Sequence, residues 1–182
     1  MPSQIGYPAL TEDDASSGNK SWTTPANAEV CDGVYATCDT GLGSGTPQDL
    51  TDQLVIAGTL SGNNMAVGAW TGGVDVVMTY GSPTSLPGVS LTPDQVNASD
   101  FGFGLQAVLS TAISHFIKAT QFGFSIPDNA QIYGVVISVK AHFNAGASVV
   151  LAVDCITMEI FYNLLARIIS IGSMADVGDF QF

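Results

Sequence analysis

The sequence predicts an all-β protein, an antiparallel β-sandwich or jelly roll built as a single domain. The first observation is that apolar and polar residues alternate with a period of two through several runs of strand length. The second is that turn-forming residues, such as Pro127-Asp128-Asn129, separate these runs. Many short strands with Gly and Pro between them are typical of two packed sheets, because each sheet must bury one apolar face.

The chain divides into a core and two extensions. Its 182 residues are enough for one sizeable domain with arms. Residues 1–20 are polar and predict an N-terminal arm, and residues 21–162 predict the sandwich. Residues 163–182 predict a C-terminal arm or an extra strand, because the run 163–170 fits either a last strand or a short helix.

The strands are predicted by alternation and by the turns that bound them. They are expected in residues 34–37, 54–60, 74–80, 101–109, 122–126, 133–143 and 148–163, with a Gly-rich loop over 39–49. Pro127 cannot donate to a ladder, so pairing should stop there and resume at Gln131. Within 148–163 the apolar residues change sides, which predicts a bulge near Asp154-Cys155 or a strand buried on both faces.

One short helix is predicted over residues 91–99. Thr92 stands at the N-cap, Pro93 at the first helical position and Gln95 at the position that completes a capping box.

The charge balance limits the kinds of partner. Only four residues are basic (Lys20, Lys118, Lys140 and Arg167), against 16 acidic ones, and the net charge is -12. Nucleic-acid binding depends on cations that replace phosphate counterions, and anionic membranes also attract cations, so neither partner is expected. Acidic side chains keep an apolar protein soluble, and they also suit the exposed face of a shell. No apolar stretch reaches the 18 residues of a membrane span.

The chain has three cysteines, so at least one of them has no partner for a disulfide within the chain. The start of the chain lacks the basic head and apolar run of a signal peptide, so we expect release into the cytoplasm and buried free thiols. Cys31 and Cys38 are close enough in sequence to bridge a loop, which is the alternative. Their spacing with Cys155 is not that of a zinc site, and no metal is expected.

The sequence predicts no catalytic residue and no cofactor. His115 and His142 are the two histidines, and neither belongs to a nucleophile elbow or a zinc motif. The run 41–45 (GLGSG) lacks the Lys-Ser/Thr of a phosphate loop. The acidic run 12–14 is interpreted as solvated charge, and paired carboxylates of a glycosidase are the remaining enzymatic alternative.

Several stretches resemble one family. The stretch WTTPANAEVCDGVYAT (22–37) resembles the opening motif of a β-sandwich domain found in tailed-phage structural proteins. The stretch FIKATQFGFSIPDNAQIYGVVISV (116–139) resembles the family's Phe-Gly-Phe-Ser-Ile-Pro block and the strand after it. The stretches 79–107 (TYGSPTSLPGVSLTPDQVNASDFGFGLQA) and 153–162 (VDCITMEIFY) resemble its Thr-Tyr-Gly and Asn-Ala-Ser segments and its closing strand. Together these stretches cover most of residues 20–162.

Two features depart from the family pattern. Pro87 stands where the family has Trp, and the block 79–107 precedes the Phe-Gly-Phe block instead of following it. Either the strands connect differently here, or two parts of the chain have been exchanged.

The resemblance implies a virion component without enzymatic activity. Among such components we expect a capsid decoration or cement protein, because the chain is short and has no coiled-coil repeat. The implied partner is the major capsid protein, the implied assembly is a homotrimer or homodimer, and the implied location is the capsid surface. The alternative is a receptor- or glycan-binding module of a head fibre or tail.

The residues expected to contact a partner are apolar residues of the last segment and two tryptophans. They are Leu164, Leu165, Ile168, Ile169, Phe180, Phe182, Trp22 and Trp70. For the terminal residues, packing on their own sandwich is the alternative.

Overall fold

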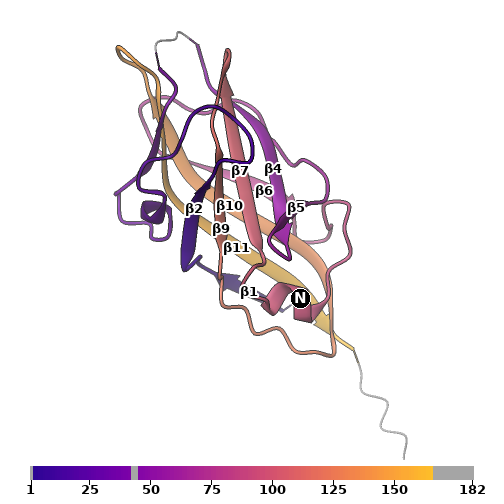
Figure 1. Ribbon diagram of the computed structural model, residues 1–182. Helices are drawn as coiled ribbons and strands as arrows, with labels where there is room; N and C mark the ends of the chain where they lie inside the picture. The colour runs from indigo at the N-terminus through magenta and orange to yellow at the C-terminus, as the bar shows by residue number, and fades with distance from the viewer. Residues whose placement is uncertain (1, 42–44, 166–182) are drawn as a thin grey trace, which may run out of the picture.

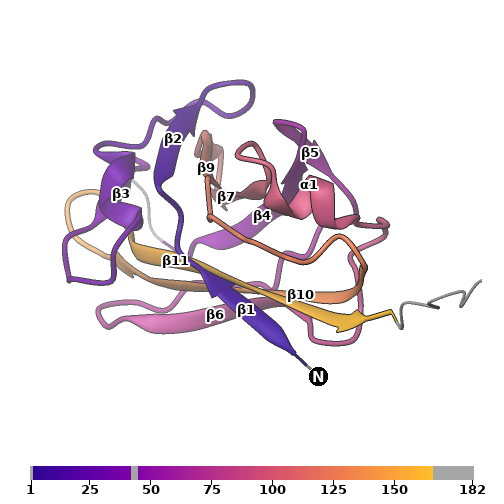
Figure 2. The same cartoon turned by 90° about the horizontal axis from the view of Figure 1, so that it is seen from below.

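The computed structural model describes residues 2–41 and 45–165. Two antiparallel sheets lie face to face and enclose one core, as Figures 1 and 2 show. The predicted all-β sandwich is therefore confirmed. Among the described residues, no helix has the length and apolar character needed to cross a membrane.

The first sheet, sheet A, is built on two long neighbouring strands. In spatial order its strands are β1 (Ser3–Gly6), β11 (Val150–Leu164), β10 (Ala130–Asn144) and β6 (Val76–Ser82), and β3 (Ala36–Asp39) also pairs with β11. β1 pairs with the C-terminal half of β11, and β3 pairs with its N-terminal end. The stretch of β11 between these two partners is the place where the candidate site forms.

The second sheet, sheet B, faces sheet A across the core. In spatial order its strands are β2 (Leu10–Asp14), β9 (Phe116–Thr120), β7 (Gly102–Leu109), β4 (Gln48–Ile56) and β5 (Thr59–Ser61), and β8 (Ala112–Ile113) pairs with β7. The short helices are the 3-10 helix η1 (Pro25–Ala28) and α1 (Pro93–Asn97). The chain crosses between the sheets several times, so some strands that are neighbours in space, such as β1 and β11, are distant in sequence.

The core follows from the alternation in the sequence. Val135, Ile137 and Val139 of β10 are fully buried, as are Phe103 and Leu105 of β7. Burial of each such side chain contributes about 1.5–3 kcal/mol. Packing of these two alternating faces therefore accounts for the association of the sheets.

Several predicted elements are confirmed. The helix forms with Thr92 as its N-cap and with both hydrogen bonds of the capping box to Gln95. The bulge in β11 also forms, because Lys140 pairs with Cys155 and the next residue of β10 pairs with Val153, which leaves Asp154 unpaired. After the turn that follows Pro127, β10 begins at Ala130, one residue before the predicted start.

The prediction of an N-terminal arm is wrong. Residues 3–6 form β1 on sheet A, and residues 10–14 form β2 on sheet B. Both strands are short and at a sheet edge, where one side of the backbone faces solvent and apolar alternation is weak. The polar composition of residues 1–20 is therefore compatible with two edge strands of the sandwich.

The run 122–126 is not a strand, although its apolar residues are buried as predicted. The run 54–60 is divided by a turn in which Ala57 has a φ of 51° and Gly58 a φ of 74°, so it contributes to both β4 and β5. β11 continues to Leu164, so the first two residues of the predicted C-terminal segment 163–182 belong to the sandwich, and the residues after 165 lie outside the described chain.

Candidate functional site

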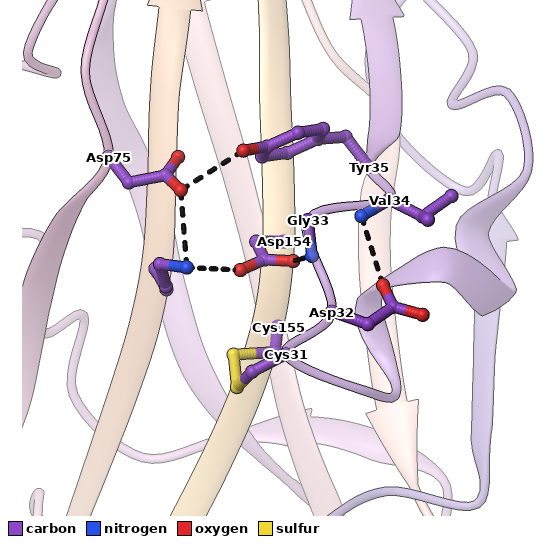
Figure 3. The surroundings of a disulfide bond; sticks show 9 residues. Cys31, Asp32, Gly33, Val34, Tyr35, Asp75, Asp154 and Cys155 are labelled. Carbon is purple, nitrogen blue, oxygen red and sulfur yellow. Dashed lines mark hydrogen bonds and ion pairs between the residues drawn. A yellow bond between two sulfur atoms is a disulfide. The ribbon is translucent and has the colours of Figure 1, made fainter.

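The candidate site is a group of polar side chains on the outer face of sheet A. We call it the lysine–carboxylate cluster, and its members are Tyr35, Asp75, Lys140, His142 and Asp154. They come from the loop before β3, the segment before β6, strand β10 and the bulge of β11. Figure 3 shows several of them beside the disulfide bond.

The bulge explains why a carboxylate is buried here. Asp154 has no partner in the ladder, and its side chain is fully buried. Its Oδ2 lies 2.6 Å from Lys140 Nζ, and its Oδ1 accepts a hydrogen bond of 2.8 Å from the backbone N–H of Gly33. A buried carboxylate is tolerated only when it is paired and hydrogen-bonded, and both conditions are met.

Asp75 joins the other members of the cluster. Its Oδ2 lies 3.2 Å from Lys140 Nζ and accepts a 3.0 Å hydrogen bond from the Tyr35 hydroxyl, while its Oδ1 lies 2.7 Å from His142 Nδ1. Burial by itself raises the pKa of Asp75, but the hydrogen bonds from His142, Lys140 and Tyr35 outweigh burial and hold this pKa below its usual value. The group therefore stays ionised above mildly acidic pH.

The bonds of the cluster leave little capacity for catalysis. The hydrogen bonds to Asp154 and Asp75 raise the pKa of Lys140, so its ammonium is a poor nucleophile. His142 donates from Nδ1 to Asp75, and its Nε2 lies 3.1 Å from the amide nitrogen of Asn144. The ring nitrogen that a general base would turn toward a nucleophile is thus already occupied.

The cysteines depart from the prediction of free thiols. Cys31 and Cys155 form a disulfide across 124 residues of sequence, and only Cys38 is a buried free thiol among the described residues. The predicted alternative of a bridge between Cys31 and Cys38 is also wrong. The sandwich brings the loop before β3 onto β11, and sequence spacing contains no information about that contact.

The disulfide is one of several contacts that attach the loop 31–35 to sheet A and to the segment before β6. Gly33 donates a hydrogen bond to Asp154. Tyr35 donates to Asp75 and packs its ring on His142. Asp32 also accepts a hydrogen bond from the N–H of Val34, which fixes the turn between them. Residues 31–35 are therefore held in place by the disulfide and by hydrogen bonds of their side chains and backbone.

Exposed valines lie in and beside the attached loop, and on both sides of Asp75 in the sequence. Val30 and Val34 are 60% and 51% exposed, and Val74 and Val77 are 64% and 61% exposed. Val77 pairs with Lys140 across the ladder, so it shares the outer face of the sheet. Apolar side chains around a satisfied polar centre are a surface suited to contact with another protein.

The tryptophans predicted to contact a partner lie in the interior. Trp22 is 4% exposed and Trp70 is 2% exposed, and their indole N–H groups donate to the His115 carbonyl and to Asp49. A buried Trp needs such a hydrogen-bond partner, which both have. We therefore do not retain them as contact residues.

The terminal contact residues are described only in part. Leu164 and Leu165 are 58% and 53% exposed, at the end of β11 and just beyond it. Ile168, Ile169, Phe180 and Phe182 lie outside the described residues.

The sequence predicts solvated charge for the acidic run 12–14, but all three of its carboxylates have basic partners. Lys118 Nζ lies 3.2 Å from Asp14 and 3.5 Å from Glu12, and His115 Nδ1 lies 3.0 Å from Asp13. These carboxylates face β9 across the ladder and neutralise one of the few basic residues. Within residues 2–41 and 45–165, no group of three or more His, Cys, Asp or Glu is arranged to hold a metal ion.

Sequence reasoning did not identify the lysine–carboxylate cluster. One available signal was Lys140, since a lysine inside a predicted strand of a chain with few cations implies a facing carboxylate. Comparisons with protein-family models, curated proteins and solved structures find no match for this chain.

Proposed function

We propose that the chain is a non-enzymatic virion protein of a tailed phage that decorates the outer face of the assembled head. The observation that carries the proposal is the outer face of sheet A. The charged groups of the lysine–carboxylate cluster are bound to one another, and the exposed large apolar side chains beside the cluster are valines. This is a surface for contact between proteins rather than for turnover of a substrate.

Two further features support this proposal. The stretches that resemble phage sandwich domains include the loop 31–35 and its attachment strand β11, so the likeness extends to residues that build the contact face. A disulfide with one exposed cysteine suits oxidising surroundings, which include the surface of a released particle.

The mechanism is stabilisation by mass action. A protein that binds the assembled shell, and not its separate subunits, shifts the equilibrium toward the shell in proportion to occupancy and affinity. Many symmetry-related copies add avidity when neighbouring copies are linked. The partner in this proposal is the major capsid protein.

The test is pelleting with heads that lack the chain and, separately, with unassembled capsid subunits. We expect binding to heads alone, together with a saturable rise in the temperature at which the heads open. Binding to neither preparation contradicts the proposal, and so does equal binding to both.

A matched pair of variants tests the face. Val34→Asp places a charge in the attached loop, and Val67→Asp places the same charge on a residue of similar exposure in the loop beside β4. We expect Val34→Asp to weaken head binding by roughly tenfold and Val67→Asp to leave it unchanged. Equal effects of the two variants would assign the contact to another face.

A further inference from the structure

The edges of the two sheets differ in how they are protected. An edge strand exposes unpaired N–H and C=O groups, and soluble proteins blunt such edges with charge, proline, short length or a cover. β2 has three consecutive acidic residues, Glu12, Asp13 and Asp14. β5 has three residues and β1 has four.

β3 is covered along its free edge. Thr23 exchanges two backbone hydrogen bonds with Thr37, at 2.7 and 3.1 Å. Within residues 2–41 and 45–165, the edge strand β6 has none of these protections. Its seven residues, Val76–Ser82, include no charged residue and no proline.

The outward side of β6 has no partner within the described chain. Residues 76–81 make no hydrogen bond from their backbone groups to any described residue other than those of β10. Val77 is 61% exposed, and Thr79 is exposed on the same face. Figure 2 shows β6 at the rim of its layer.

We infer that the free edge of β6 pairs with β6 of a second copy, antiparallel about a two-fold axis, so that sheet A continues through both copies. Such an isologous contact uses the same residues twice and closes on itself. It satisfies the outward backbone groups of both strands, as strand addition does in peptide recognition.

Charge favours this edge for contact between copies. Each copy has a net charge of -12, so two copies repel each other wherever their acidic surfaces meet. β6 has no charge, and the nearest carboxylate, Asp75, is bound to Lys140 and His142. This edge is therefore a place where two copies approach with little repulsion.

The backbone of β6 also sets the register. Gly81 has a φ of 79°, outside the extended region, so the regular strand covers residues 76–80. Pairing that uses all of it is centred on Met78. Val77 of one copy then lies opposite Thr79 of the other, a pair of β-branched side chains that favours strand pairing.

The first test is the association of the chain by sedimentation over a wide concentration range. Val77→Lys/Thr79→Lys places lysine opposite lysine in the proposed register. Ile5→Lys/Tyr7→Lys makes the same charge change at exposed residues on and just after β1, at the opposite edge of sheet A from β6. We expect the β6 variant to raise the dimer dissociation constant at least about tenfold while the control pair leaves it unchanged. Circular dichroism melting checks that both variants fold.

The second test reads the register directly. Chains with Val77→Cys are mixed with chains with Thr79→Cys under mild oxidation. The proposed register predicts more cross-linked dimer in the mixture than in either chain alone.

Three results would overturn the inference. They are a wild-type monomer at every concentration, a dimer that survives the lysine pair, and cross-linking that is equal in all three samples. If the chain is a monomer and dimerises only when truncated after Leu165, the chain's own C-terminal segment occupies the free edge of β6 instead of a second copy. These outcomes do not depend on head binding, so the proposed function is tested separately.

Discussion

Asp52 is fully buried, and neither of its carboxyl oxygens accepts a hydrogen bond from any residue that the structure describes. Burial, the largest cause, and the nearby charge of Asp49, the second, together raise the pKa of Asp52 to about 9. The backbone N–H of Gln106 acts in the opposite direction and does not outweigh them. Asp49 acts on Asp52 from the same strand, β4, and Asp52 in turn raises the pKa of Tyr80 on β6. The folded protein therefore holds Asp52 as a neutral acid at pH 7.

This neutral acid makes stability depend on pH in a defined direction. Below pH 4 the folded and unfolded chains both keep the proton, whereas between about pH 4 and 9 only the unfolded chain loses it. Stability therefore falls as pH rises through this window. Asp52→Asn cannot ionise, so we expect it to be more stable than the wild type by on the order of 3 kcal/mol at pH 7, with a smaller difference at pH 4.

Denaturation by guanidinium at both pH values measures the effect. Asp128→Asn is the control, because it removes an exposed carboxylate from a turn. An Asp52→Asn variant whose advantage is equal at pH 4 and pH 7 would show that the acid is not held neutral by the fold.

At the scale of elements, the disulfide joins the loop before β3 to β11 across 124 residues. Cross-links that close long loops restrict the unfolded chain, and in the chain-entropy account a loop of this size is worth roughly 4–5 kcal/mol. We expect Cys31→Ala/Cys155→Ala to lose several kcal/mol of this order in the free energy of unfolding. Reductant should lower the wild type to the same level.

Cys38→Ala serves as the control for the disulfide, since Cys38 is buried and free. This variant should still respond to reductant. Wild-type protein whose melting temperature is the same with and without reductant would contradict the role of the bond.

The capping box of helix α1 should contribute less to the free energy of unfolding than the disulfide does. Thr92 caps it by accepting from the N–H of Gln95, and Gln95 Oε1 accepts from the N–H of Thr92 in return. We expect Thr92→Ala to cost about 1 kcal/mol in thermal or chemical unfolding. Thr111→Ala, which changes an exposed turn residue, should cost close to nothing, and equal losses in the two variants would remove the capping box from the account.

The elements also show what the sequence can predict. Strands whose apolar residues alternate, such as β7 and β10, are predicted because the alternation marks the face that packs in the core, and α1 is predicted because its cap is local. β1 and β2 are missed because edge strands need little apolar alternation. The pairing of Cys31 with Cys155 and the contacts of Asp75 are missed because they depend on how distant segments meet in space.

At the scale of the whole molecule, the described sandwich ends at residue 165. Truncation after Leu165 leaves every described strand in place. If the following residues reach a neighbouring subunit on the head, this truncation should weaken pelleting with heads while the melting temperature stays the same. Unchanged binding would exclude that segment from the contact and leave the outer face of sheet A as the binding surface.

The most direct measurement is a density map of the intact particle in which this chain is traced. The account predicts copies distributed over the head, with the outer face of sheet A or its neighbouring edges against capsid subunits. Density for the chain at a single vertex or on the tail would favour a receptor-binding module, and particles that lack the chain altogether would contradict a role in the virion.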